Sequence, residues 1–507
     1  DFDLDLFCSL DILVYLVAEN ITDIMNTIHL IESRKGNLYL FSYRGRSLSF
    51  VHPKMSHIIR QMFKDEYKTG KSRKYYERKV AYLKKHGLFN NETFEHKIVK
   101  FDRSQVRDSL IHVGQIIFEV TNSCNLKCKY CCFNDLYEES SLINKQGKLG
   151  FETAKKLLDY LMELWGDTLC SKEVDIAFYG GEPLLNYSFI KKVLNYTEHL
   201  KSDRLRFTYS MTTNGLLLDK YLDDLVNKNF KILVSLDGDF DASVYRVGED
   251  RRDLYDKIIN NLDLYKNKYP LHFERNVDFN VVIHRKNDIQ SVFSFIKKKY
   301  GKTPRFSPLS TRNVKESQKE TFKTMYRKMP DDLIEGKDLD AITENLHPYT
   351  SGFMEMVKFA NALLDIQYQT YNDLFVNTGL NDIVYTPSGT CWPFSRKFFL
   401  STNGDILACE KISHRNVLGN VDNNSVNIDY INIADIYNEK IYSSFSDCKK
   451  CYRLPYCPVC FFDSLLGDRS CLAFEDENKF TENLKRKIDY LELNPIQVNE
   501  ILKIKVQ

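Results

Sequence analysis

Short apolar segments alternate with amphipathic ones from about residue 115 to residue 310. The apolar segments are rich in β-branched and aromatic residues, which is typical of buried strands. They are 115–121, 174–179, 205–211, 231–236 and 277–283. Segments with helical periodicity lie between them, at 151–165, 187–200, 219–229, 254–268 and 288–300. Alternating strands and helices imply parallel strands joined by right-handed crossovers. The predicted fold class is therefore α/β, a partial barrel of five or six units that is open on one side.

Three cysteines directly follow the first predicted strand, at Cys124, Cys128 and Cys131. Thiolates at this CxxxCxxC spacing can hold three irons of a small iron–sulfur cube and leave the fourth iron free for a substrate or cofactor. The loop lies at the C-terminal end of a strand, where α/β barrels place their chemistry. A zinc loop is the alternative, although zinc loops favour CxxC pairs.

The composition limits the class of protein. The chain has 507 residues, enough for two to four domains, and its net charge of +2 gives no signature of nucleic-acid binding. No apolar run reaches the roughly 18 residues that a membrane span needs. Ten of the 13 cysteines fall in tight clusters, which indicates metal ligation in a reducing compartment. We expect a cytoplasmic protein that works without oxygen.

Polar motifs follow the later strands as well. Gly180, Gly181 and Glu182 come after the second strand, and the segments 210–215 and 235–238 close the next two. The glycines allow close approach of the backbone to a ligand, and the glutamate offers an acceptor for an ammonium group. A plain Gly-Gly turn is the alternative.

The CxxxCxxC motif, with an aromatic residue before its last cysteine, resembles that of the radical S-adenosylmethionine (radical SAM) superfamily. The resemblance implies that the cluster binds SAM, that segment 180–182 meets the methionine amino group, and that Ser210 and Arg246 lie at its carboxylate. A solvated surface arginine is the alternative for Arg246. The residues that the resemblance assigns to SAM or its pocket are Tyr130, Gly180, Gly181, Glu182, Ser210, Asn214, Ser235, Asp237 and Arg246.

The C-terminal cysteines resemble the SPASM extension of radical SAM enzymes, which holds two auxiliary clusters. One departure is that Cys457 and Cys460 are separated by two residues instead of three. The resemblance implies one cluster held by Cys448, Cys451, Cys457 and Cys471, and another held by Cys391, Cys409 and Cys460. Lys397 occupies a position where some members have a further cysteine, so we expect an open iron or a non-cysteine ligand there. Together with the first cluster, this makes three [4Fe–4S] clusters. Two zinc knuckles are the alternative.

The first 110 residues precede the barrel. Two strands at 37–43 and 47–51, followed by helices at 53–64 and 72–87, resemble a winged-helix element that binds the leader of a precursor peptide as an added strand. A structural cap is the alternative. The expected division is 1–110 for this domain, 111–310 for the barrel, 311–387 for a bridging region, 388–475 for the SPASM domain and 476–507 for a C-terminal helix.

Segments such as CKYCCFND and GTCWPFSRKFF resemble those of maturases that build thioethers in Cys-rich peptides, the sactipeptide and ranthipeptide enzymes. This resemblance implies a SAM-dependent enzyme, a precursor-peptide substrate and a flavodoxin or ferredoxin electron donor. Glu410 follows Cys409 where sulfatase-maturing relatives carry an acidic base, and either a catalytic or a structural role is open to it. Cys132 is either a catalytic thiol or, as we favour, a buried structural cysteine. The alternatives are a C–C cross-linking or epimerising enzyme, a formylglycine-forming maturase, and a peptide-binding scaffold with an inactive SAM site.

Overall fold

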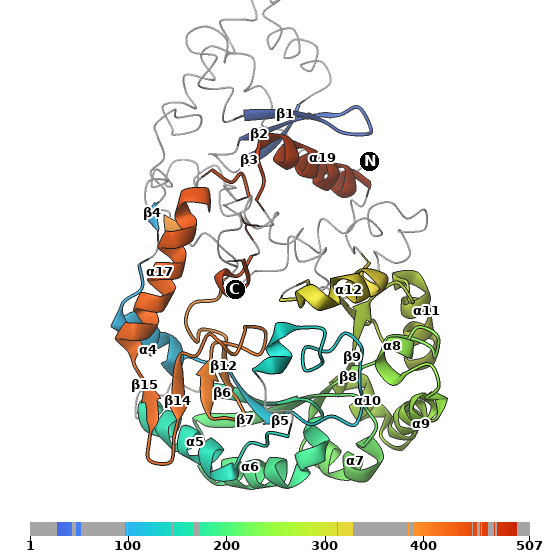
Figure 1. Ribbon diagram of the computed structural model, residues 1–507, viewed down its shortest axis with the longest axis vertical. Helices are drawn as coiled ribbons and strands as arrows, with labels where there is room; N and C mark the ends of the chain where they lie inside the picture. Colours follow the sequence, from blue (N-terminus) through green and yellow to red (C-terminus); the bar gives the residue numbers. More distant parts are fainter. Residues whose placement is uncertain are drawn as a thin grey trace, which may run out of the picture.

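In the part of the chain that the structure describes, six parallel strands form the barrel sheet of the computed structural model (Figure 1). They follow one another across the sheet in chain order. They are β5 (Gln115–Thr121), β6 (Lys172–Gly180), β7 (Leu205–Thr213), β8 (Lys231–Ser235), β9 (Val277–Ile283) and β10 (Arg305–Pro308). The five predicted strands are confirmed, and β10 adds a sixth. The structure describes residues 28–42, 47–51, 97–98, 100–142, 146–166, 172–311, 313–327, 384–385, 390–448, 450–453, 457, 459–464, 471 and 474–493.

The predicted barrel helices are also confirmed and cover the outer face of the sheet (Figure 1). They are α5 (Phe151–Trp165), α6 (Tyr187–Leu200), α7 (Leu218–Asn227), α9 (Arg252–Lys268) and α11 (Ile289–Tyr300), with the shorter α8 (Val244–Val247), α10 (Pro270–Asn276) and α12 (Lys319–Met325). Side chains alternate between the two faces of a strand. On β5, Phe118 therefore packs outward against Phe189 of α6, with ring centroids 5.9 Å apart. Its neighbour Glu119 faces the inside of the barrel.

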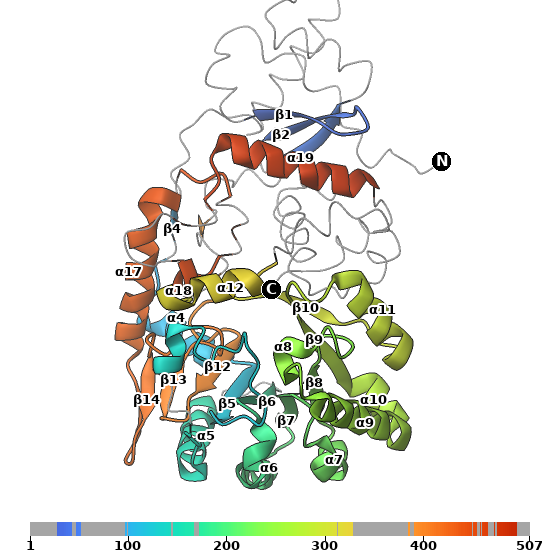
Figure 2. The same ribbon diagram turned by 45° about the vertical axis from the view of Figure 1, so that its right-hand side comes forward.

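The cysteine-rich C-terminal segment extends this same sheet. β12 (Lys397–Leu400) pairs in parallel with β5, and β13 (Asp405–Leu407), β14 (Gly419–Val421) and β15 (Val426–Ile428) continue the sheet antiparallel. The long helix α17 (Tyr430–Cys448) then packs beside α4 (Arg103–Ile111), as Figures 1 and 2 show. The side chain of Asn438 joins them by bonding both the N–H and the C=O of Phe101, at 2.8 and 2.9 Å. The extension is thus fixed to the barrel.

The N-terminal part forms a small antiparallel sheet of β1 (Ile28–Glu32), β2 (Leu38–Ser42) and β3 (Ser47–Val51). The predicted hairpin at 37–51 is confirmed, and β1 is an additional strand. The helices expected at 53–64 and 72–87 lie outside the described residues. A second short pairing joins β4 (Lys97–Ile98) to β11 (Val384–Tyr385).

The C-terminal helix α19 (Glu477–Leu493) lies along the N-terminal sheet (Figure 2). Glu492 accepts hydrogen bonds from Tyr39 Oη at 2.7 Å and from Asn37 Nδ2 at 2.8 Å. Asp489 accepts one from the backbone N–H of Arg34 at 2.6 Å. The N-terminal sheet and α19 therefore form one structural unit, although the sequence analysis places them in separate domains. No described helix is both long and apolar enough to cross a membrane.

Candidate active site

The three cysteines of the CxxxCxxC loop begin three residues beyond β5. The sulfur of Cys124 accepts weak hydrogen bonds from Leu126 N at 3.4 Å and from Asn214 Nδ2 at 3.6 Å. Cys128 Sγ lies 4.0 Å from Arg246 Nη1. Burial raises the pKa of Cys128 to about 12 in the metal-free protein, despite the opposing charge of Arg246. A bound iron would supply the positive charge that keeps such a buried thiol ionised.

The two glycines of the motif after β6 allow the backbone to pack against the start of this loop. A Cβ on Gly180 would lie 2.3 Å from the carbonyl oxygen of Thr121, and one on Gly181 would lie 2.2 Å from that of Ser123. The N–H of Gly181 also donates to Thr121 O at 2.7 Å. The close approach expected from the sequence is therefore to the backbone that leads into Cys124.

Glu182 is fully buried and bonds to the protein itself. Its carboxylate accepts hydrogen bonds from Thr213 Oγ1 and Asn214 N, both at 2.8 Å, and from Leu184 N at 3.2 Å. Burial raises the pKa of Glu182 to about 7, and these hydrogen bonds oppose that rise. In this geometry the carboxylate holds the ends of β6 and β7 together, which leaves the backbone of 180–182 to meet a ligand.

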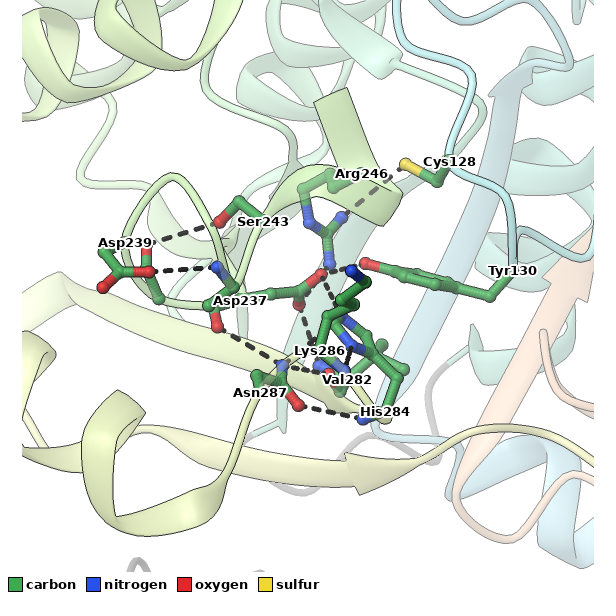
Figure 3. Close-up of polar contacts among 12 residues, drawn as sticks. Cys128, Tyr130, Asp237, Asp239, Ser243, Arg246, Val282, His284, Lys286 and Asn287 are labelled. Atoms are coloured by element: carbon green, nitrogen blue, oxygen red, sulfur yellow. Dashed lines mark hydrogen bonds and ion pairs between the residues drawn. The ribbon is translucent and has the colours of Figure 1, made fainter. Parts of the chain in front are cut away.

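Asp237 and Arg246 form a buried ion pair beside the cysteine loop (Figure 3). Arg246 Nη2 lies 2.9 Å from Asp237 Oδ1, and Tyr130 donates its hydroxyl hydrogen to the other carboxylate oxygen. His284 Nε2 lies 3.7 Å from the same carboxylate. Burial alone would raise the pKa of Asp237, but the charge of Arg246 and the hydrogen bonds from its neighbours lower it to about 2.

Arg246 keeps a buried donor for a further anion. Its Nε atom is buried and makes no hydrogen bond, and its side chain is 7% exposed. A carboxylate such as that of SAM fits this position because a guanidinium binds carboxylates through several N–H groups. Asp237 therefore orients the arginine. The alternative of a solvated surface arginine is wrong.

The two serines assigned to the SAM pocket lie on neighbouring strands. Ser210 is on β7, and its hydroxyl donates to Asp175 Oδ2 on β6 at 2.6 Å. Ser235 ends β8 beside Asn280 of β9. Asn214 follows β7 and bonds Asn125 Oδ1 at 2.7 Å, so it ties this end of the sheet to the cysteine loop.

Neighbouring C-terminal cysteines influence the pKa values of two side chains, and the ligand sets of the two auxiliary clusters stay predictions. Burial, and after it interaction with Cys457, Cys451 and Cys471, raises the pKa of Cys448 to about 12. The thiols of the second group, Cys391, Cys409 and Cys460, all act on the hydroxyl of Tyr437, whose pKa is raised first by burial and then by these three sulfurs.

None of these described cysteines forms a disulfide bond. No three of the described His, Cys, Asp and Glu side chains converge as closely as one metal ion requires. A [4Fe–4S] cube has ligands that lie further apart than those of a single metal ion, because each thiolate binds a different iron.

A cavity of about 300 Å³ lies between the CxxxCxxC loop and the loop that follows Cys409. One side is lined by Tyr130, Cys132, Phe133, Tyr137 and Glu139, and the other by residues 410–416. Cys132 lies in this lining and is exposed, so the favoured prediction of a buried structural cysteine is wrong. Glu410 lies there too, and one of its oxygens bonds Lys397 Nζ at 2.7 Å. Lys397, at the position of the absent cysteine, is thus an ion-pair partner of Glu410.

Sequence reasoning missed Glu119, His414 and His284. Glu119 is 1% exposed on β5 and accepts a hydrogen bond from Thr402 N at 2.9 Å. Its other oxygen faces His414 Nε2 at 3.7 Å. Glu119 could have been found from the sequence, because it is a lone charged residue within an apolar strand. Such a residue is explained only if the interior of the barrel is polar or charged. No motif contains the two histidines.

Residues 118–295 match the family model of the Radical SAM superfamily. This region is similar to the domains of that superfamily. Chemistry that depends on SAM and a [4Fe–4S] cluster is therefore confirmed, as is the expectation of an enzyme.

Two curated relatives show how far this similarity extends. The "Radical SAM cyclopropyl synthase TigE" of Paramaledivibacter caminithermalis is 29% identical over 38% of this chain and 39% of its own length. This chain therefore spans about two fifths of that relative. The "Cysteine-type anaerobic sulfatase-maturating enzyme" of Clostridium novyi is 20% identical over 68% of this chain and 86% of its own length.

Solved structures share the fold beyond the matched domain. The structure "Native anSMEcpe with bound AdoMet" has a TM-score of 0.53 at 18% identity, and the likeness covers 77% of this chain and 100% of that one. A second structure of anSMEcpe carries the Cp18Cys peptide and has a TM-score of 0.51. At this identity the likeness shows the fold, which is a radical SAM barrel with a cysteine-rich C-terminal extension.

Proposed function

We propose that this protein modifies a ribosomally made precursor peptide through a 5′-deoxyadenosyl radical. The observation that carries the proposal is the cavity walled by the radical SAM cysteine loop on one side and by the loop after Cys409 on the other. A substrate in this cavity would lie between the proposed sites of the radical-generating cluster and of an auxiliary cluster. A relative named as a sulfatase-maturating enzyme and a similar structure solved with a bound peptide support a peptide as the substrate.

The cluster held by Cys124, Cys128 and Cys131 would cleave SAM to supply the radical. Arg246 would bind the SAM carboxylate, and Asp237 holds the arginine in place from behind. Tyr130 donates to Asp237 and also lines the cavity, so it forms part of the wall between the SAM site and the substrate. These buried groups position the reactants and exclude water.

The bond that we propose is a thioether. Its formation removes a hydrogen atom from a substrate carbon, a proton from a cysteine thiol and one electron. Two auxiliary [4Fe–4S] clusters, on the ligand sets inferred from the sequence, would provide the electron acceptor. Glu410 lines the cavity beside Cys409 and would accept the proton, while Lys397 holds its second oxygen. Flavodoxin or ferredoxin would deliver the electron that SAM cleavage consumes.

The leader of the precursor would bind to the N-terminal sheet. Among the described strands, β3 is an edge strand, since the order is β1-β2-β3. An edge strand offers unpaired backbone groups to an extended peptide. Residues 1–110 would then act as a leader-recognition domain of winged-helix type.

The test is coexpression with a candidate Cys-rich precursor under anaerobic conditions, followed by mass spectrometry of the peptide. Thioether formation predicts the loss of two hydrogens per cross-link and the loss of one alkylatable thiol. A C–C cross-link would give the same mass without loss of the thiol, and an epimerase would leave the mass unchanged. A precursor with no change in mass or stereochemistry, in the presence of active SAM cleavage, would contradict the proposed function.

Formylglycine formation is the second candidate. Glu410 directly after Cys409, together with the 86% coverage of the Clostridium novyi maturase, favours it. Formylglycine formation converts a single cysteine to an aldehyde, which a hydrazide probe detects. Thioether formation produces no aldehyde.

A further inference from the structure

Three of the carboxylates that line the cavity beside the cysteine loops each have one oxygen without a hydrogen bond. They belong to Glu119, Glu139 and Glu410, and in each of them one buried oxygen atom makes no hydrogen bond. The other oxygen of each is already used, by Thr402 N, Asn313 Nδ2 and Lys397 Nζ respectively. Buried carboxylate oxygens without donors cost free energy. Three of them in one cavity therefore indicate a ligand that brings donors.

The acidic and basic side chains that line the cavity differ in their exposure to solvent. Glu119 is 1% exposed, and the side chain of Glu410 is 12% exposed. By contrast, Arg415 is 62% exposed and pairs with Glu138, which lies outside the cavity lining, at 3.5 Å. Lys411 in the same loop is also exposed. We call the carboxylates of Glu119, Glu139 and Glu410 the acidic floor of the cavity and the exposed Lys411 and Arg415 its basic rim, and His414 and Lys440 also line the cavity.

Glu119 is the strongest element of this site. His414 faces its unpaired oxygen at 3.7 Å, beyond hydrogen-bond distance, and burial raises the pKa of Glu119 despite that neighbour. The position on β5 is rigid, because β5 is paired on both sides by β6 and β12. A charge so buried and so fixed binds a cation without first having to be ordered.

We propose that this acidic floor binds the cationic side chain, lysine or arginine, of a substrate peptide, and so selects which segment of the peptide enters the cavity. The inference rests on the proposed function and deepens it by naming a feature of the substrate. An ammonium or guanidinium group offers several donors, enough for more than one of the unpaired oxygens. The basic rim would hinder acidic segments from entering.

The experiment uses the reconstituted holoenzyme and three fluorescently labelled nine-residue peptides of glycine and serine. Their central residue is lysine, N-acetyl-lysine or norleucine. Fluorescence anisotropy should show that the lysine peptide binds at least tenfold more tightly than either neutral peptide, which is about 1.4 kcal/mol. Glu119→Gln and, separately, Glu139→Gln should each reduce this preference at least threefold. Glu138→Gln is the matched control, since this exposed neighbour lies outside the cavity lining, and it should keep the preference.

Melting curves and iron content of each variant show whether it is folded and loaded. Equal binding of the three peptides to the wild type, or failure of the lysine peptide to bind, would overturn the inference. A lysine preference that survives both substitutions in folded protein would place the cation elsewhere and would also overturn it. The proposed function fails differently, through an unmodified precursor, and selective lysine binding would stand in that case.

Discussion

Replacing Asp237 by Asn should destabilise the barrel and weaken SAM binding. Asp237 is completely buried and pairs with Arg246 at 2.9 Å. The charge of Arg246 and the hydrogen bonds to the carboxylate lower its pKa from 3.8 to about 2 on folding, which contributes roughly 2 kcal/mol at neutral pH. Removing one partner of such a pair leaves the other charge buried, which typically costs about 3–5 kcal/mol. We expect a loss in this range.

The sign of the pH dependence follows from the same pair. Because the pKa of Asp237 is lowered on folding, its contribution to stability is present above about pH 3.8 and is lost as the pH falls through about 2. The Asp237→Asn variant should therefore lose stability at neutral pH and resemble the wild type more closely near pH 2.

Urea unfolding followed by tryptophan fluorescence is the assay. The chain has two tryptophans, and Trp165 is fully buried in the barrel core whereas Trp392 is 40% exposed. In a Trp392→Phe background, the signal reports on the barrel. Asp237→Asn should lower the midpoint, and Asp237→Asn combined with Arg246→Met should recover much of the loss because no unpaired charge remains. An unchanged midpoint for Asp237→Asn alone would refute the reasoning.

Other substitutions test the remaining parts of the site. Changing Cys124, Cys128 and Cys131 together to Ala should remove about four of about 12 irons, one cube of three, and abolish 5′-deoxyadenosine production, as iron analysis and chromatography can check. Gly181→Ala should lower iron loading of that cube and SAM cleavage together, because its Cβ would lie 2.2 Å from the backbone oxygen of Ser123, and Gly114→Ala is a control with no atom within 4 Å of its Cβ. Lys397→Met should slow peptide modification while SAM cleavage without peptide persists, because it breaks the 2.7 Å pair with Glu410, and equal modification rates would remove Glu410 from the mechanism. Deleting residues 1–100, which keeps Phe101 and α4, should weaken binding of full-length precursor in anisotropy, and unchanged affinity would make that segment a structural cap.

Local periodicity predicted the barrel well. The helices 151–165 and 187–200 begin and end as predicted, since their apolar positions repeat with helical spacing and glycine or asparagine precedes each. The four-residue β10 and the strand β1 were not predicted from the sequence. The pairing of β12 with β5 joins segments about 280 residues apart, and no local signal encodes such a contact.

The residues of the site that lie in one contiguous motif were predicted from the sequence. Those that come together from distant segments were missed. The cysteines and the segment 180–182 are contiguous, so their chemistry is visible in the sequence. The glycines and Glu182 nevertheless contact the protein's own backbone and side chains, which the motif alone does not indicate. Glu119 and His414 come from distant segments and meet only because β12 and β13 extend the barrel sheet.

The most direct test of the central claim is transfer of deuterium from the substrate to the cleaved cofactor. The reconstituted enzyme would be incubated with SAM, a reductant and a precursor peptide made from deuterated amino acids. Mass spectrometry would then measure the deuterium content of the released 5′-deoxyadenosine. A radical that attacks a peptide in the cavity predicts 5′-deoxyadenosine that carries deuterium, and none from the Cys124, Cys128 and Cys131 variant. Release of undeuterated 5′-deoxyadenosine alone, with the precursor unchanged, would contradict the account.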